Sequence, residues 1–263
     1  MTEASMSKTI EMRILRQDSE NSAPYWDDFS MPWSENMNVI ACLMEIQLNP
    51  VNKAGKKVNP IVWESNCLEE VCGACSMVIN GKPRQACSAL VDRLTQPISV
   101  QPLSKFKVVR DLVVDRSPMF QALSKVKAWM PIDGTYDLGP GPKISVEQAE
   151  RIYTFARCMT CGCCMEVCPQ YNASSDFIGP APLAQANLFS QNGSGALNKA
   201  ERLQAVMGSG GVTDCGKAQN CSKACPKEIP LTEAIAELSL ETNKQMIKDL
   251  LAKGAPRNFG GPA

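Results

Sequence analysis

The chain has 263 residues with 27 basic and 27 acidic side chains, and 44% of its residues are hydrophobic. This length allows one large domain or two ordinary ones with real hydrophobic cores. A net charge of zero without a basic stripe argues against a nucleic-acid partner. No segment resembles a signal peptide and no run approaches the roughly 18–20 apolar residues of a membrane helix, so we expect a soluble chain.

Cysteine dominates the possible chemistry, because the chain contains 13 cysteines and no histidine. Clustered thiols in a chain without a secretory signal indicate a reducing compartment, where they more often bind metal than form disulfides. The lack of histidine excludes Cys₂His₂ zinc, Rieske centres and histidine-based catalysis from this chain alone. What remains is thiolate chemistry.

The first hundred residues predict a small mixed sheet packed on one helix. Residues 8–16 alternate between apolar and polar side chains, which is typical of a half-buried strand. Asn80-Gly81 offers the positive φ angles of a tight hairpin turn. The remaining elements expected here are a helix over 38–50, a hairpin over 76–86 and a strand over 98–103.

The first cysteine group has the plant-type ferredoxin spacing of a [2Fe–2S] cluster, x₄ and then x₂. Its members are Cys67, Cys72, Cys75 and, twelve positions later, Cys87. Gly73–Ala74 should let backbone N–H groups approach the sulfurs. The short gap before the last cysteine departs from plant-type ferredoxins, and a Cys₄ zinc site is the disfavoured alternative.

The second half predicts helices interrupted by two cysteine runs. Residues 131–142 are rich in turn formers and mark a boundary, after which Ser145 and Gln148 form a capping box. The helices expected are 145–157, one opened by Asn198 and closed by Gly208, and 231–254. We therefore divide the chain into a [2Fe–2S] domain (1–104), a connecting helix and Gly/Pro-rich linker (105–144), a helical domain (145–254) and a mobile tail (255–263).

The run CMTCGCCMEVCP has the spacing of a bacterial ferredoxin, in which the fourth cysteine ligates the other cluster. Its spaced members are Cys158, Cys161, Cys164 and Cys168, followed by Pro169. Cys163 falls outside this spacing. We expect Cys163, like Cys42 in the first helix, to be a small buried hydrophobe.

The run CGKAQNCSKACP follows the same template but has Ala218 where the second cysteine should stand. If each fourth cysteine serves the other run, one site is a complete [4Fe–4S] cluster and the other lacks a thiolate. The [4Fe–4S] ligands would be Cys158, Cys161, Cys164 and Cys225. The three-thiolate site predicts a [3Fe–4S] cluster, or less favourably a cubane with one labile iron, and its ligands would be Cys168, Cys215 and Cys221. Together the three centres predict a carrier of single electrons.

These motifs resemble the iron–sulfur subunit of succinate dehydrogenase and quinol:fumarate reductase. The resemblance rests on CLEEVCGACSMVINGKPRQAC, CMTCGCCMEVCP, CGKAQNCSKACPKEIPL and the segment FIGPAPLAQANLF (177–189). It implies an α+β fold, in which an N-terminal β-grasp, plant-type ferredoxin-like domain precedes an all-α two-cluster bacterial-ferredoxin-like domain.

The resemblance also implies partners and a location. A flavoprotein subunit with FAD would oxidise succinate, and a haem-containing membrane-anchor cytochrome b would hold the quinone. The chain would then sit peripherally on the cytoplasmic face of a bacterial inner membrane. Ubiquinone-reducing members have a tryptophan and a histidine where this chain has Ala173 and Gly216, so it looks closer to the menaquinone-linked type with a single dihaem anchor subunit. Only Pro169 remains as a possible quinone contact.

Three alternatives stay open. The same subunit could serve quinol:fumarate reductase, since an electron carrier does not determine direction. A standalone ferredoxin-like carrier or redox sensor would run as a free monomer, whereas a subunit would co-purify with a flavoprotein. A zinc-binding interaction module would contain no acid-labile sulfide.

Overall fold

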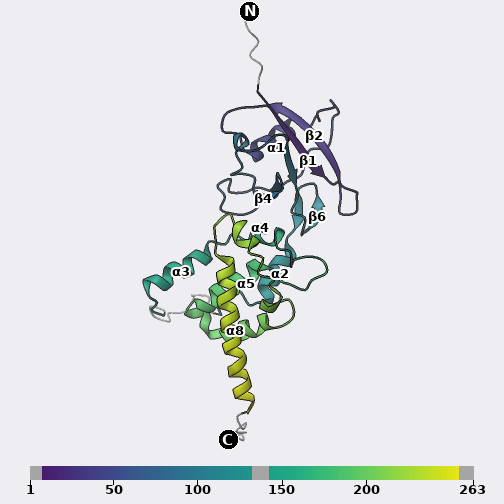
Figure 1. Cartoon of the computed structure of the whole chain (residues 1–263). Helices are drawn as coiled ribbons and strands as arrows, with labels where there is room; N and C mark the ends of the chain where they lie inside the picture. The colour runs from purple at the N-terminus through teal and green to yellow at the C-terminus, as the bar shows by residue number, and fades with distance from the viewer. Residues whose placement is uncertain (1–7, 132–141, 255–263) are drawn as a thin grey trace, which may run out of the picture.

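The computed structural model describes residues 8–131 and 142–254 and shows two lobes. We call residues 8–101 the sheet lobe and residues 142–254 the helical lobe; residues 102–131 connect them (Figure 1). The predicted tail (255–263) and most of the predicted linker lie outside the described residues. The α+β organisation expected from the sequence is confirmed.

The sheet lobe is built on a five-stranded mixed sheet in the order β2-β1-β5-β3-β4. Only β1 and β5 are parallel, and the other neighbours are antiparallel. The strands are β1 (Thr9–Arg16), β2 (Tyr25–Pro32), β3 (Ser76–Ile79), β4 (Lys82–Gln85) and β5 (Ile98–Gln101). Strand β2 is the one element of this sheet that the sequence analysis did not predict.

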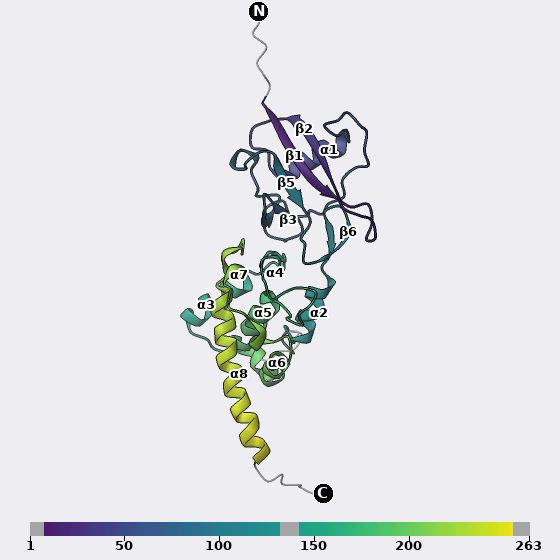
Figure 2. The same ribbon diagram turned by 45° about the vertical axis from the view of Figure 1, so that its right-hand side comes forward.

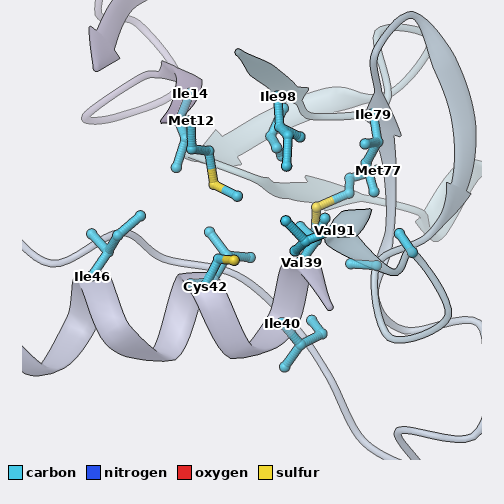
Figure 3. Packing of buried hydrophobic residues seen from close by; sticks show 14 of the residues in the cluster. Met12, Ile14, Val39, Ile40, Cys42, Ile46, Met77, Ile79, Val91 and Ile98 are labelled. Carbon is cyan, nitrogen blue, oxygen red and sulfur yellow. The ribbon is translucent and has the colours of Figure 1, made fainter. Parts of the chain in front are cut away.

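Helix α1 (Val39–Leu48) covers one face of the sheet (Figure 3). Its N-cap is Asn38, whose side-chain oxygen accepts a hydrogen bond from the Ala41 N–H at 2.9 Å. Such a cap satisfies a backbone donor that the helix itself leaves unpaired. The core that forms against the strands includes the predicted buried Cys42, which is 0% exposed.

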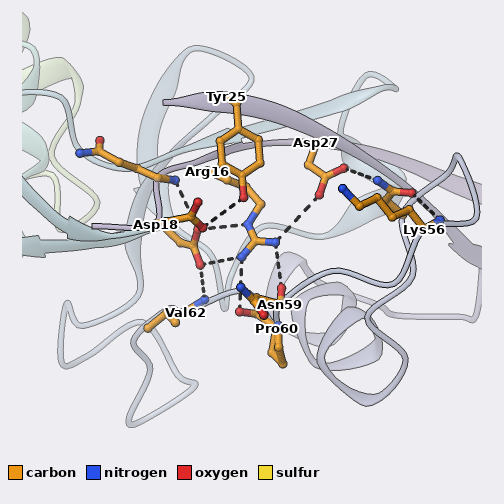
Figure 4. A network of polar contacts seen from close by, with 11 residues as sticks. Arg16, Asp18, Tyr25, Asp27, Lys56, Asn59, Pro60 and Val62 are labelled. Atoms are coloured by element: carbon orange, nitrogen blue, oxygen red, sulfur yellow. Dashed lines mark hydrogen bonds and ion pairs between the residues drawn. The ribbon is translucent and has the colours of Figure 1, made fainter. Parts of the chain in front are cut away.

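A buried ion pair fastens the end of β1 to the loop that leads to the first cysteine group (Figure 4). The Arg16 guanidinium donates to Asp111 from both Nε and Nη2 at 3.0 Å, and to the Asn59 carbonyl oxygen at 2.8 Å. The backbone N–H groups of Val62 and Gln17 donate to the same carboxylate. Both charged side chains are fully buried, so these bonds satisfy groups that water cannot reach.

The connecting segment holds a hairpin and a helix, of which only the helix was expected. Its elements are β6 (Lys107–Arg110), β7 (Val113–Asp115) and α2 (Ser117–Lys125), whereas the 3₁₀ helix η1 (Val91–Arg93) precedes β5 in the sheet lobe. Side chains of this segment, among them Phe106 and Met119, pack into a core of the helical lobe. The segment is therefore part of the structure around the second and third cysteine groups.

The helical lobe is built around α5, which packs against α8, α6, α3 and α2 (Figure 2). Its elements are α3 (Val146–Ala156), α4 (Cys163–Glu166), α5 (Pro180–Gln191), η2 (Ser194–Asn198), α6 (Lys199–Met207), η3 (Val212–Asp214), α7 (Asn220–Lys223) and α8 (Leu231–Gly254). The predicted cap of α3 is confirmed, since Gln148 N–H donates to Ser145 Oγ at 3.1 Å. Across residues 8–131 and 142–254, no helix has the length and apolar character to cross a membrane.

Two details of this lobe differ from the sequence analysis. Asn198 precedes α6 as expected, but its side chain accepts from Arg202 instead of capping the helix. Helix α5 had no predicted periodicity, because it is buried on almost every side and begins with Pro180 and Pro182. Proline is compatible with the first turn, where a backbone N–H would have no partner within the helix.

Candidate iron–sulfur sites

Backbone N–H groups converge on the sulfurs of the loop before β3. Cys67 Sγ accepts hydrogen bonds from Glu69, Val71 and Cys72 at 3.3 to 3.4 Å, and Cys72 Sγ accepts one from Ala74 at 3.4 Å. These bonds lower the pKa of the Cys67 thiol to about 7. The donors predicted from Gly73–Ala74 are thus present in part, and they favour a thiolate, which is the form that binds iron.

The loop wraps tightly because several of its residues have left-handed backbone conformations. Leu68 (φ 60°), Glu70 (φ 56°) and Gly73 (φ 75°) all have positive φ. Cys87 approaches the same loop from the end of β4, and burial raises the pKa of its thiol to about 11. The side-chain amide of Asn38 donates to the Cys87 carbonyl oxygen at 2.9 Å, which links this cysteine to the cap of α1.

The first recess of the helical lobe is lined by cysteines from both runs. We call it the four-cysteine recess, and its cysteines are Cys158, Cys161, Cys164 and Cys225. Burial raises the pKa of Cys158 to about 11, and burial also raises that of Cys164. Hydrogen bonds from the Cys163 thiol and backbone instead lower the pKa of Cys161 to about 7. The four sulfurs meet in the grouping that the exchanged fourth cysteine predicts.

The second recess has three cysteines and an alanine. We call it the three-cysteine recess, and its cysteines are Cys168, Cys215 and Cys221. Ala218 lines the same recess, as does Pro169, the residue singled out as a quinone contact. The methyl group of Ala218 offers no ligand atom at the position where the template expects a thiolate.

The residues of the two recesses fit iron–sulfur groups by their chemistry. Every sulfur-bearing ligand candidate is an unpaired cysteine, and no disulfide joins any of the thirteen. Among the described residues, no three cysteine or carboxylate side chains converge closely enough to hold a single metal ion. The short helix α4 supplies Cys164 to the four-cysteine recess, and the short helix α7 supplies Cys221 to the three-cysteine recess.

The first cysteine loop touches the four-cysteine recess directly. A Cβ atom on Gly73 would lie 2.8 Å from the Met159 carbonyl oxygen and 2.9 Å from Cys161 Cβ, so only glycine fits here. Arg116 fastens the same place by donating to the Gly73 carbonyl oxygen at 2.9 Å. The two lobes thus meet at their candidate iron–sulfur sites.

Two polar residues at this junction were not identified from the sequence. Gln85 is fully buried at the end of β4, and its Nε2 lies 3.7 Å from Cys163 Sγ. Cys163 is buried as predicted, but its contacts with Gln85 and Cys161 show that it is more than an apolar filler. Nothing in the local pattern around Gln85 could have revealed a partner 78 residues away.

Family models match both lobes. A 2Fe-2S iron-sulfur cluster binding domain matches residues 11–121, and a 4Fe-4S dicluster domain matches residues 154–229. The fold and the grouped cysteines therefore define a multi-cluster iron–sulfur electron-transfer protein.

Known relatives narrow this class. The chain is 56% identical to the succinate dehydrogenase iron-sulfur subunit of Bacillus subtilis, over 93% of this chain and 97% of the relative. It is 30% identical to the fumarate reductase iron-sulfur subunit of Mycobacterium tuberculosis, over 94% and 98%. The chain belongs to the family of succinate dehydrogenase iron–sulfur subunits, which are components of an oxidoreductase complex.

A solved structure shares the fold. A chain of the Mycobacterium smegmatis Sdh1 complex in the apo form matches with a TM-score of 0.75 and 21% sequence identity, over 91% of this chain and 97% of that chain. At 21% identity this match supports a shared fold and nothing further, and the shared fold extends over both lobes.

Proposed function

We propose that this chain passes single electrons from the FAD of a partner flavoprotein, through [2Fe–2S], [4Fe–4S] and [3Fe–4S] clusters, to a quinone held with a haem-containing membrane-anchor cytochrome b. The observation that supports it most is the meeting of each cysteine run with one cysteine of the other run around a recess. When bound, such clusters accept and release one electron at a time.

The protein's own residues would hold three centres. The proposed [2Fe–2S] ligands are Cys67, Cys72, Cys75 and Cys87. The proposed [4Fe–4S] ligands line the four-cysteine recess, and the proposed [3Fe–4S] ligands line the three-cysteine recess. The backbone donors to Cys67 and Cys72 would offset negative charge on those sulfurs, which makes a centre easier to reduce.

The contact between the lobes supports transfer from the first centre to the second. Gly73 lies in the loop of the proposed [2Fe–2S] ligands, and a side chain there would meet Cys161 of the four-cysteine recess. The three-cysteine recess would then be last in line. We propose that it faces the anchor subunit, with the chain bound peripherally to the cytoplasmic face of a bacterial inner membrane.

For the acceptor we propose menaquinone. The histidine of ubiquinone-reducing members corresponds to Gly216 here, and a Cβ atom at that position would lie 2.6 Å from Gln170 Nε2. The Gln170 amide therefore occupies the space beside Gly216. Pro169, on the wall of the three-cysteine recess, stays a proposed quinone contact. A purified complex that reduces ubiquinone analogues well and menaquinone analogues poorly would contradict this assignment.

Low-temperature EPR of the complex tests the whole assignment. The tagged chain is recovered from detergent-solubilised membranes of its own host, and spectra are recorded before and after succinate is added. We expect a near-isotropic [3Fe–4S] signal that succinate abolishes, together with a new [2Fe–2S] signal. A three-iron signal that succinate leaves unchanged would contradict the partner or the direction. Iron without acid-labile sulfide would contradict all three centres.

A further inference from the structure

A buried polar cluster lies where the two lobes meet, between the proposed ligands of two different centres. Gln85 at the end of β4 is 0% exposed, Ser76 at the start of β3 is 6% exposed and Cys163 at the start of α4 is 0% exposed. Buried polar groups cost free energy unless they are hydrogen-bonded. The hydrogen-bond partners of these three side chains therefore show what the cluster connects.

One end of the cluster reaches a proposed ligand, and the other lies beside one. Cys75 Sγ lies 3.7 Å from Gln85 Oε1, and Gln85 Nε2 lies 3.7 Å from Cys163 Sγ. Cys163 stands two residues after Cys161, a proposed ligand in the four-cysteine recess. The Gln85 amide is held in place by Ser76 Oγ, which accepts from Nε2 at 3.0 Å. Hydrogen-bond contacts therefore run from Cys75 to Cys163, beside the four-cysteine recess.

These contacts would remain when Cys75 binds iron. A ligating Cys75 has no proton to donate, so Gln85 Oε1 would no longer be the favourable group beside it. The oxygen and the NH₂ group of a glutamine amide have nearly the same shape, so a half-turn presents Nε2 to Cys75 and Oε1 to the Cys163 thiol. In that orientation the NH₂ group donates to the ligand sulfur of Cys75, and the Cys163 thiol donates its one proton to Oε1.

We propose that Gln85 and Cys163 form a hydrogen-bonded bridge between the [2Fe–2S] and [4Fe–4S] centres, in which the Cys163 thiol orients the Gln85 amide toward Cys75 and the amide raises the reduction potential of the [2Fe–2S] centre. The inference rests on the proposed function, which assigns Cys75 and Cys161 as ligands. Donors near a ligand sulfur stabilise the added negative charge of the reduced state. Gln85 and Cys163 are positioning residues, because they touch ligands and not iron.

Potentiometric EPR titration of the purified complex tests the bridge. We expect Gln85→Leu to lower the potential of the [2Fe–2S] centre, with about a tenfold smaller ratio of reduced to oxidised cluster at a fixed ambient potential, or 59 mV for one electron. The [3Fe–4S] potential serves as an internal reference. Gln101→Leu, on β5 of the same sheet and half-buried, is the matched control.

Substitutions of Cys163 supply a second test that does not depend on glutamine. Cys163→Ala should lower the [2Fe–2S] potential, because the Gln85 amide loses the donor that orients it, and Cys163→Ser, which keeps a donor, should restore it. Cys42→Ala, another fully buried thiol, should leave this potential unchanged. Wild-type potentials in Gln85→Leu and Cys163→Ala, with full iron and sulfide content, would overturn the bridge and leave the proposed function standing. Absence of the cluster signals from the wild-type complex would overturn both.

Discussion

Replacing Asp111 with alanine should open the sheet lobe while leaving the helical lobe unchanged. The Asp111 carboxylate accepts two bonds from Arg16 at 3.0 Å, one from the Val62 N–H at 3.0 Å and one from the Gln17 N–H at 3.3 Å. The substitution leaves a fully buried guanidinium without its carboxylate. Breaking a buried pair in this way costs about 3–5 kcal/mol.

Hydrogen exchange measures this loss of stability in Asp111→Ala. A cost of about 3–5 kcal/mol raises the opening equilibrium roughly a hundredfold to a few thousandfold, since each 1.4 kcal/mol is tenfold. We expect this faster exchange in peptides of β1 and of the loop at residues 59–66, measured on the intact complex by mass spectrometry. Peptides of α5 and α8 should exchange as in the wild type.

A surface ion pair provides the control. Lys8 Nζ and Asp92 lie 2.8 Å apart with side chains 57% and 43% exposed, so Lys8→Ala should cost under about 1 kcal/mol. The double variant Arg16→Met/Asp111→Leu should recover part of the loss, because it removes the buried guanidinium that has lost its carboxylate, while Asp27 keeps its hydrogen bond from Asn52. Exchange in Asp111→Ala no faster than in Lys8→Ala would refute the assigned role of the buried pair.

Three further substitutions test the sites and the junction. Ala218→Cys should replace the three-iron EPR signal with a four-iron signal; an unchanged spectrum would mean that residue 218 does not face the cluster. Gly73→Ala forces a side chain against Met159 at φ +75° and should slow reduction of the [4Fe–4S] centre at least tenfold in stopped-flow measurements, whereas Gly55→Ala, at φ +77° in open space, should not. Arg202→Met removes buried donors to the Lys127 and Trp129 carbonyl oxygens and should lower stability by about 2–4 kcal/mol, seen as earlier urea unfolding of the helical lobe.

The cysteine groupings were predictable from the sequence because ligand spacing is a local property. The runs at 158–169 and 215–226 repeat one template, so the missing thiolate at Ala218 could be seen without a structure. The cap of α3 was predictable for the same reason, because the Ser145 hydroxyl accepts from a backbone N–H three residues away, whereas Asn198 bonds Arg202 and does not cap α6. The ligand assignment itself remains a prediction.

Elements that depend on distant partners were not predictable. Strand β2 has buried residues at alternating positions, but one of them is the charged Asp27. The sequence therefore lacks the alternation of apolar and polar side chains that predicts a strand. That carboxylate is tolerated because Asn52 Nδ2 donates to it at 2.9 Å and Arg16 lies 3.9 Å away. Gln85 is a similar case, since its partner Cys163 lies in the other lobe.

The exchange of cysteines between the two recesses has a consequence for biogenesis. On the proposed assignment, the four-cysteine recess needs Cys225 and the three-cysteine recess needs Cys168, so neither contains a full ligand set from one run. A nascent chain that has emerged only to α6 can offer three thiolates to the first centre and one to the second. Cluster insertion into the helical lobe must therefore follow translation of almost the whole chain, whereas the sheet lobe has all four of its proposed ligand cysteines once residue 87 is translated.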